Sequence, residues 1–238
     1  MIMFKFREIN KTTYEMFLNR ELWCASPISL NDPFDSQFDY HAFSKKIAQL
    51  TKNKPRPLDI NELTQHAKNT IENLGICSFS QKKNNQLMWS HYADEHRGLC
   101  IEFDVREILN RNSDLSFAFV NYQSELPELK LAEEFIVALE SLKKGFDNIA
   151  SDEFRKILKT KSIDWSYESE ARIIKLEYGV IKFSPECILS ISFGLRTSKK
   201  DILNIRKLLN HKDYSHVKWF RAKKSSINYD LDFERIID

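Results

Sequence analysis

The chain has 238 residues, of which 42% are hydrophobic and 29% charged, and its 36 basic and 34 acidic side chains leave a formal net charge of +2. This balance predicts a globular protein, and we expect a single domain over residues 1–238. So small a net charge excludes a global field that attracts nucleic acid or an anionic membrane.

Two further features bear on location and metal binding. No apolar run approaches the ~18 residues that span a bilayer, and Met1–Lys5 lacks the apolar segment of a signal peptide. We therefore expect a cytoplasmic protein that does not interact with membranes. The four cysteines are far apart without CxxC spacing, which favours buried thiols over disulfides or a zinc site, so we expect no metal.

The first half of the chain mixes strand and helix signals. Alternating apolar and basic residues predict a strand at Met3–Arg7. Thr12 and Glu15 have the spacing of a capping box, which predicts the start of a helix. The other elements expected up to residue 122 are a helix capped by Asp59 and ended by Gly75, a helix at Asn85–Glu95, and strands at Leu22–Ser26, Gly75–Ser80, Leu99–Asp104 and Leu115–Tyr122.

The second half contains more strands than helices. Apolar residues at helical spacing predict helices at Glu128–Lys144 and Asp152–Lys159, and Ser198 with Asp201 opens a third. Strands are expected at Trp165–Glu177, Val180–Phe183, Ile188–Gly194, His216–Ala222 and Asn228–Phe233. Because strands and helices do not alternate strictly, we predict an α+β fold with a mixed or antiparallel sheet and inserted helices. The chain has no GxGxxG or GxxxxGK[ST], so neither a Rossmann site nor a P-loop is supported.

The segment Trp165–Arg172 is the first candidate for chemistry. In a strand, side chains alternate between the two faces, so Glu168, Glu170 and Arg172 would share one face. Neighbouring carboxylates repel unless a cation or a proton lies between them, which in a site raises one pKa or organises a ribose hydroxyl. The alternative is a solvated strand face on which Arg172 neutralises Glu170.

The segment Met88–Tyr92 is the second candidate. On a helix, Leu87, Met88, His91 and Tyr92 would form one stripe. His91 or Tyr92 could then donate a hydrogen bond to a substrate at the edge of a pocket. The alternative is an ordinary core helix.

The segment Leu30–Asp35 is the third candidate. Asn31, Asp32 and Pro33 are typical of a turn, and we expect Phe34 to plug that turn onto the core. As an alternative, Asp32 and Asp35 could bind a metal or orient a base.

The N-terminal strand adds two basic side chains, because Lys5 and Arg7 share a face. That face could bind phosphate. It could equally be a charged edge that discourages aggregation.

With these segments identified, the chain resembles a bacterial family described only as domain of unknown function 2971. The family name implies no activity. The resemblance rests on Lys5–Arg7, Leu22–Pro27, Asn31–Asp35, Met88–Tyr92, Gly98–Asp104 and the pattern Trp165-x-x-Glu168-x-Glu170-x-Arg172.

A second resemblance, to the ADP-ribosyltransferase fold, rests on an early basic residue, a middle Ser and a late E-x-E pair. It implies Glu170, Glu168 and Arg172 as catalytic residues, with a Glu that holds the ribose 2′-hydroxyl as nicotinamide leaves NAD. The residues implied to bind NAD are Lys5, Arg7, Ser26, Ser80, His91 and Tyr92.

Three hypotheses follow. The first is an ADP-ribosyltransferase-like enzyme that uses NAD, as a toxin or phage-defence effector with a protein or nucleic-acid acceptor and a cognate antitoxin or defence-system partner. The second is a metal-dependent nuclease or hydrolase with Asp32, Asp35, Glu168 and Glu170 as ligands and Lys161 or Arg172 as the transition-state cation. The third is a sensor or binding module without catalytic activity, in which these motifs are core and loop contacts.

Overall fold

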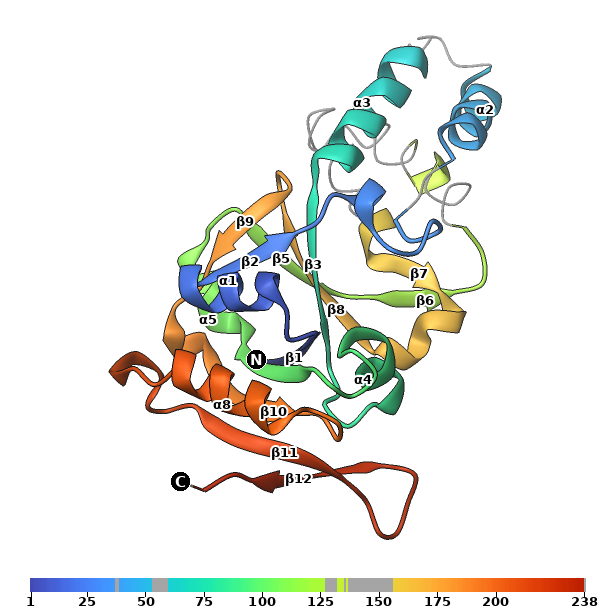
Figure 1. The fold of residues 1–238 in the computed structure, drawn as a ribbon. Coiled ribbons are helices and arrows are strands. Elements are labelled where there is room, and N and C mark those ends of the chain that lie inside the picture. The colour runs from blue at the N-terminus through green and yellow to red at the C-terminus, as the bar shows by residue number, and fades with distance from the viewer. Residues whose placement is uncertain (37–38, 53–59, 127–131, 135, 137–155, 238) are drawn as a thin grey trace.

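The computed structural model describes residues 1–36, 39–52, 60–126, 132–134, 136 and 156–237. Within them, helices accompany a mostly antiparallel mixed sheet, which confirms the α+β class (Figure 1). The strands are β1 (Ile2–Arg7), β2 (Glu21–Cys24), β3 (Gly75–Ser80), β4 (Leu99–Asp104), β5 (Leu115–Phe119), β6 (Asn121–Gln123), β7 (Thr160–Ser162), β8 (Glu170–Lys175), β9 (Gly179–Lys182), β10 (Ile188–Phe193), β11 (Lys218–Lys224) and β12 (Leu231–Arg235).

Helices of two kinds connect these strands. The α-helices are α1 (Lys11–Asn19), α2 (Tyr40–Thr51), α3 (Ile60–Asn73), α4 (Gln86–Tyr92), α5 (Val105–Arg111) and α8 (Lys199–Leu208). The short 3₁₀ helices are η1 (Pro27–Ser29), η2 (Ile157–Lys159), η3 (Ile163–Glu168), η4 (Pro185–Cys187) and η5 (Lys212–Tyr214). No helix in the described part of the chain is both long and apolar enough to cross a membrane.

The main sheet of the described residues has eight strands in the order β12-β11-β10-β4-β1-β3-β8-β5. Neighbouring strands are antiparallel except β10 and β11, which run parallel. Two smaller sheets pair β2 with β9 and β6 with β7.

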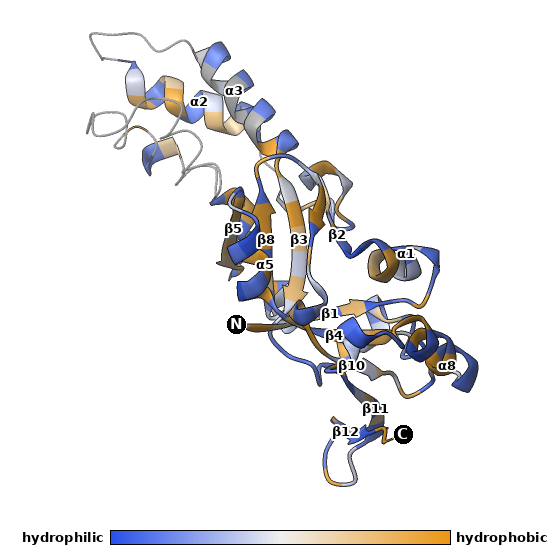
Figure 2. Ribbon diagram, turned by 90° about the vertical axis from the view of Figure 1, so that its left-hand side faces the viewer, coloured by the Kyte–Doolittle hydropathy of each residue, from blue (hydrophilic) through white to orange (hydrophobic). Residues whose placement is uncertain are grey.

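The main sheet changes direction between β1 and β3. These strands share one register pair, Phe4 opposite Ser80, whereas β1 pairs with β4 along its whole length. In Figure 2, β3, β8 and β5 run in a different direction from β1, β4 and β10. Beyond that pair, a side-chain hydrogen bond connects the two strands in place of backbone hydrogen bonds: Lys5 Nζ donates to the Ser78 carbonyl at 2.8 Å.

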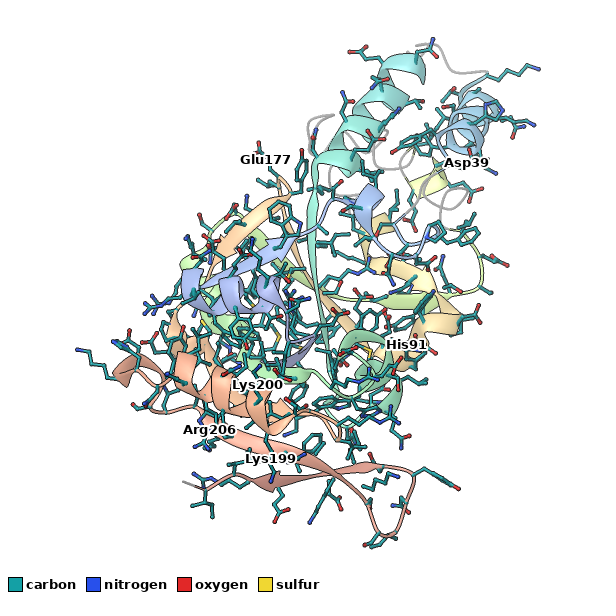
Figure 3. All side chains as sticks on the ribbon, in the orientation of Figure 1. Asp39, His91, Glu177, Lys199, Lys200 and Arg206 are labelled. Atoms are coloured by element: carbon teal, nitrogen blue, oxygen red, sulfur yellow. The ribbon has the colours of Figure 1, made fainter. Side chains whose placement is uncertain are left out.

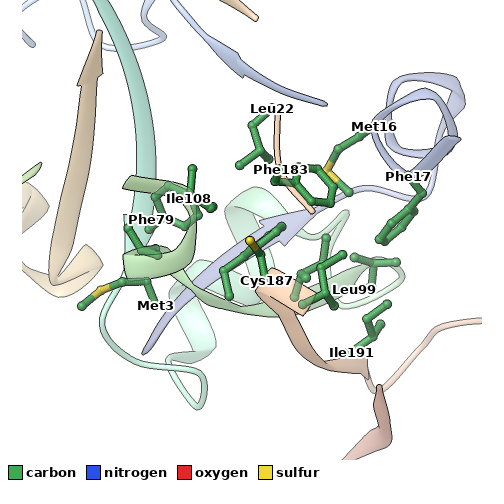
Figure 4. Close-up of a cluster of buried hydrophobic side chains, with 14 of the residues drawn as sticks. Met3, Met16, Phe17, Leu22, Phe79, Leu99, Ile108, Phe183, Cys187 and Ile191 are labelled. Atoms are coloured by element: carbon green, nitrogen blue, oxygen red, sulfur yellow. The ribbon is translucent and has the colours of Figure 1, made fainter. Parts of the chain in front are cut away.

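The largest hydrophobic cluster joins the sheet to the helices that cover it. Phe17 of α1 and Ile108 of α5 are buried in it with strand residues such as Leu99 (Figure 4). Ile205 of α8 is buried in the same cluster. Full burial of each such side chain contributes about 1.5–3 kcal/mol. A separate cluster holds α4 against β1, where the rings of Phe6 and Trp89 meet edge to face at 5.3 Å.

Several predicted elements are confirmed. The strands at Gly75–Ser80 and Leu99–Asp104 are found with the predicted bounds. Ser198 caps α8, because its side chain accepts a hydrogen bond from the Asp201 N–H.

The predicted boundaries of two helices are wrong. Asn10, rather than Thr12, caps α1, because its side-chain oxygen accepts from the Thr13 N–H. The helix predicted at Asn85–Glu95 is capped by Asn85 but ends at Tyr92, since residues 94–96 all have positive φ.

Other boundaries also differ. Gly75 begins β3 and does not end the preceding helix, whose last residue is Asn73. The predicted strand Leu115–Tyr122 is divided at Val120 into β5 and β6. Most of the helices predicted at 128–144 and 152–159, and the cap at Asp59, fall outside the described residues.

The strand predicted over Trp165–Glu177 is wrong in its first part. Residues up to Glu168 form the 3₁₀ helix η3, which Ser162 caps by accepting from the Asp164 N–H. Ser169 then adopts a left-handed conformation with φ 45°, and β8 starts only at Glu170. This local capping and turn override the alternating pattern of the sequence.

Candidate functional site

A small cavity of about 130 Å³ opens where β1 and β3 diverge. We call it the inner cavity. β1 and β3 form its walls, the loop before α2 and the helix α4 border it, and carboxylates and an ammonium group reach it from β7, η3 and β8. Its lining residues are Phe4, Lys5, Phe6, Leu30, Asn31, Asp35, Ser78, Phe79, Ser80, Met88, Tyr92, Lys161, Glu168 and Glu170.

The Lys161 ammonium lies among three carboxylates of this cavity. Its Nζ is 2.6 Å from Glu168, 3.2 Å from Glu170 and 3.3 Å from Asp35. All four side chains are buried. Buried charges are stable only when they are paired, so this cluster forms one connected ionic network.

Arg172 completes the network from behind the cavity. Its side chain is 0% exposed, and its guanidinium contacts both carboxylate oxygens of Asp35 and both of Glu170 at 2.6–3.0 Å. The remaining guanidinium nitrogen donates to Ser36 Oγ at 3.0 Å and to the Leu158 carbonyl at 2.8 Å. With every guanidinium nitrogen engaged, Arg172 positions the carboxylates and does not line the cavity.

The turn at Ser169 brings the two glutamates together. Glu168 ends η3 and Glu170 begins β8, with the left-handed residue between them. Ser80 Oγ donates to the Glu168 carbonyl at 2.7 Å, and the Glu170 N–H donates to Tyr122 Oη at 2.7 Å. These bonds fix the backbone on both sides of the turn.

The two carboxylates have different electrostatic environments. Burial raises the pKa of Glu168, and the opposing effects of Lys161 and the Tyr92 hydroxyl do not cancel it. Burial also acts on Glu170, but Arg172 and then Lys161 outweigh it and hold the Glu170 pKa at about 2. Although burial lowers the pKa of Lys161, the surrounding carboxylates raise it overall, so the ammonium stays charged. Such a divergence within one pair is typical of groups that exchange protons in catalysis.

Tyr92 connects α4 to this pair. Its hydroxyl donates to Glu168 Oε1 at 2.5 Å. Burial, followed by the hydrogen bond and charge of Glu168, raises the pKa of Tyr92, which therefore remains a hydrogen-bond donor at neutral pH.

One part of the chain matches a known family. Residues 88–173 match the model of the family described as "Protein of unknown function (DUF2971)". This part of the chain is similar to that family. The DUF2971 range contains Tyr92, Lys161, Glu168, Glu170 and Arg172, so it covers most of the ionic network.

Two other comparisons gave no match, either to a curated protein or to a solved structure. The DUF2971 resemblance noted from the sequence thus has support over residues 88–173, whereas the resemblance to the ADP-ribosyltransferase fold has none.

Five of the nine residues selected from the sequence border the inner cavity. Glu168 and Glu170 are there with Lys5, Ser80 and Tyr92.

The other four lie elsewhere. Arg7 donates to Thr12 and Thr13 at the start of α1, and Ser26 Oγ donates to the Glu72 carbonyl. His91 is exposed on α4 (Figure 3), and Arg172 lies behind the carboxylates.

Two expectations about neighbouring side chains are wrong. Phe34 does not plug its turn onto the core, because it is 73% exposed. The predicted stripe on α4 is also not the buried one, since Met88 and Trp89 are buried while Leu87 and His91 are exposed. The Asx turn itself is present, with the Phe34 N–H donating to Asp32 Oδ1 at 2.9 Å.

The sequence points to Lys161 and Asp35 only in secondary roles: Lys161 as a cation for a metal-dependent reaction, and Asp35 as a metal ligand or a group that orients a base. A lone lysine and a turn aspartate carry no pattern that shows they meet. Only the tertiary fold brings the loop before α2 against β7.

A second cavity lies beside the first. We call it the outer cavity; its volume is about 400 Å³ and it shares Lys161 with the inner cavity. Trp165 and the exposed Phe34 give it aromatic walls, and Asp32, Asp164 and Glu125 add acidic groups.

A larger cavity, about 1050 Å³, lies away from these carboxylates between α8, β11 and residues 235–237. Its described lining has basic residues, including Arg206, Lys207 and Lys218, but no Asp or Glu. We favour the smaller inner cavity as the candidate site, because convergent buried carboxylates with shifted pKa values are the better indication of chemistry.

Proposed function

We propose that this protein is an enzyme that breaks the N-glycosidic bond of NAD and transfers the ADP-ribosyl group. The observation that carries the proposal is the pair Glu168 and Glu170. Both carboxylates border one cavity, yet the pKa of Glu168 is raised and that of Glu170 is lowered to about 2.

The two carboxylates suit the two halves of the reaction. As the bond from ribose C1′ to the nicotinamide nitrogen breaks, its electron pair stays on nicotinamide and positive charge develops on the ribose. Glu170, kept ionised by Arg172, supplies a fixed negative charge that stabilises this oxocarbenium-like state. Glu168, whose raised pKa lies closer to neutrality, accepts the proton of the attacking nucleophile.

The dimensions of the two cavities support a dinucleotide. Pockets for ligands of drug size hold about 300–1,000 Å³, so the inner cavity of about 130 Å³ accommodates only one part of NAD. The outer cavity, of about 400 Å³, offers Phe34 and Trp165 as surfaces for a base. Lys161 lines both cavities, so we expect its ammonium to meet a pyrophosphate that crosses between them.

A metal-dependent hydrolase is a weaker candidate. The Lys161 ammonium already contacts Asp35, Glu168 and Glu170, where a metal ion would need the same oxygens. Among the described residues, no group of three or more His, Cys, Asp or Glu side chains is arranged to hold a metal ion. A sensor without catalytic activity is also less favoured, because Glu168 and Glu170 do not lie on a solvated sheet face.

The experiment is a nicotinamide-release assay. Purified protein is incubated with NAD, with and without bacterial lysate, and nicotinamide and labelled ADP-ribose are followed by chromatography. We expect release by the wild type and a loss of about 10²–10³-fold in Glu170→Gln, because one stabilising group at the transition state is neutralised.

The matched control is Glu102→Gln, which changes a half-buried strand glutamate that Ser190 contacts outside the cavity. This variant should keep wild-type activity. The proposal fails if folded wild type releases no nicotinamide under any condition, or if Glu170→Gln is as active as the wild type.

The biological setting belongs to the same proposal. As a toxin or phage-defence effector, the enzyme would modify a protein or nucleic-acid acceptor, and a cognate antitoxin or defence-system partner would restrain it. Transfer of labelled ADP-ribose to one component of the lysate would identify the acceptor.

A further inference from the structure

Cys24 at the end of β2 and Cys77 in β3 lie opposite each other. The next residues, Ala25 and Ile76, form an antiparallel bridge in which each N–H donates to the other carbonyl at 2.8 Å. In an antiparallel pair, the position beside such a hydrogen-bonded pair holds two facing residues without a hydrogen bond between their backbones. Cys24 and Cys77 occupy that position, so the register of the bridge makes them facing residues.

The spacing of this position suits a disulfide. Facing residues of antiparallel strands have Cα atoms about 4.5–5.5 Å apart, within the range of about 4.4–6.8 Å that disulfides require. The strands also approach closely here, because a Cβ added to Gly75 would lie 2.8 Å from the Cys24 Cβ. This register predicts that the sulfurs can bond without a large movement of either strand.

One thiol of the pair, that of Cys77, has a lowered pKa and is therefore the better nucleophile. The hydrogen bond from Cys24 lowers the pKa of Cys77; burial opposes this, and the Lys5 ammonium lowers the pKa further. By contrast, burial raises the pKa of Cys100 well above its usual range. A thiolate beside a cation is the reactive form of cysteine.

We propose that Cys24 and Cys77 form a redox-active dithiol that peroxide oxidises to an intramolecular disulfide. The Cys77 thiolate attacks one peroxide oxygen, the O–O bond breaks, and hydroxide leaves, taking up a proton to give the first water. Cys77 then carries a sulfenic acid. The Cys24 sulfur attacks the Cys77 sulfur, the S–O bond breaks, and the second water leaves with the Cys24 proton. Two thiols thus lose two electrons as one hydrogen peroxide becomes two waters.

The disulfide would lie directly behind the inner cavity. Lys5, whose charge lowers the pKa of Cys77, lines that cavity, as does Ser78, the next residue of β3. Oxidation would remove the thiolate beside Lys5 and tie β2 to β3 at this wall. The oxidation itself does not depend on the reaction proposed for the carboxylates.

The experiment maps the disulfide in the full-length protein. Folded protein is treated with hydrogen peroxide, free thiols are alkylated in denaturant, and the peptides are analysed by mass spectrometry without reduction. We expect a cross-link between Cys24 and Cys77, while Cys100 and Cys187 are recovered alkylated.

Two matched variants each remove a completely buried cysteine: Cys24→Ala and Cys187→Ala, both 0% exposed in the wild type. Cys24→Ala should lose the cross-link and leave Cys77 as a sulfenic acid that dimedone traps. Cys187→Ala should form the cross-link at the wild-type rate. Circular dichroism establishes that each variant is folded.

Wild-type protein alone suffices to overturn the proposal, so the test does not depend on the variants folding. A cross-link that forms only after denaturation, or one that joins either cysteine to Cys100 or Cys187, would show that the native pair is not a redox site.

Discussion

Arg172 is the residue that holds the buried carboxylates in position. It is completely buried and bonded to Asp35, Glu170, Ser36 and the Leu158 carbonyl. A buried ion pair contributes little net stability compared with apolar residues, but loss of one partner leaves the other charge unpaired. The network is therefore sensitive to single substitutions.

Arg172→Met tests this sensitivity. It leaves Asp35 and Glu170 with Lys161 as their remaining cation, and we expect the free energy of unfolding to fall by about 3–5 kcal/mol. Urea denaturation followed by circular dichroism measures the change.

The control is Arg7→Met, since the Arg7 guanidinium donates to only the Thr12 and Thr13 hydroxyls in the described structure. A loss of about 1 kcal/mol is expected there. Equal losses in the two variants would contradict a network centred on Arg172.

The hydrogen bond from Tyr92 predicts a shift in the pH dependence of activity. It stabilises the ionised form of Glu168 and so lowers a pKa that burial has raised. Tyr92→Phe should therefore raise the Glu168 pKa further. Because the proposed base must be ionised, activity is lost as the pH falls through this pKa, and the acidic limb of the kcat/KM profile should move to higher pH.

Tyr229→Phe, a change of a fully exposed tyrosine, should leave the same profile unmoved. If the acidic limb of the Tyr92→Phe profile stays in place or moves to lower pH, Glu168 is not the base.

At the scale of elements, the turn between η3 and β8 determines the position of the two glutamates. Ser169 has φ 45° and ψ 52°, a left-handed conformation that non-glycine residues adopt at a cost of about 1–2 kcal/mol. The Ser166 carbonyl, which accepts from the Ser169 N–H at 3.2 Å, holds this turn.

Two substitutions at Ser169 should thus have different effects on the stability of the protein. Ser169→Gly should preserve or slightly raise stability, whereas Ser169→Val should lower it by at least about 1 kcal/mol, because a β-branched residue disfavours positive φ. Thermal unfolding of both variants, with Ser166→Val as an exposed neighbouring control, measures the difference. A stable Ser169→Val would mean that the turn is not held in this conformation.

Part of this site can be predicted from the sequence at the level of elements. Strand alternation correctly places Glu170 and Arg172 on one face of β8. Glu168 reaches the same cluster for a different reason, because the Ser162 cap and the turn at Ser169 replace the first half of the predicted strand with η3.

The rest of the site could not be predicted, for a physical reason. Lys161 and Asp35 meet through contacts between segments far apart in the sequence, and no local pattern encodes such a contact. Capping residues and alternation act over a few neighbours, so they predict β3, β4 and α8 well. The divergence of β1 from β3 arises from the packing of the whole sheet.

At the scale of the whole molecule, that divergence creates the site. The one register pair between β1 and β3 leaves space that a fully paired sheet would close. α4 borders the space from one side, packed on β1 through Phe6 and Trp89, and the loop with Asp35 borders it too. An irregularity in an otherwise regular sheet thus provides a cavity whose walls are strands and a helix, the kind of support that positioned chemistry requires.

We propose that the inner cavity binds the ribosyl end of NAD against Glu168 and Glu170. The most direct test is a crystal structure of the Glu170→Gln variant soaked with NAD, so that the ligand is bound but turned over slowly. We expect nicotinamide and its ribose in the inner cavity, with the pyrophosphate near Lys161. NAD bound elsewhere, or an inner cavity that holds only water at saturating NAD, would contradict it.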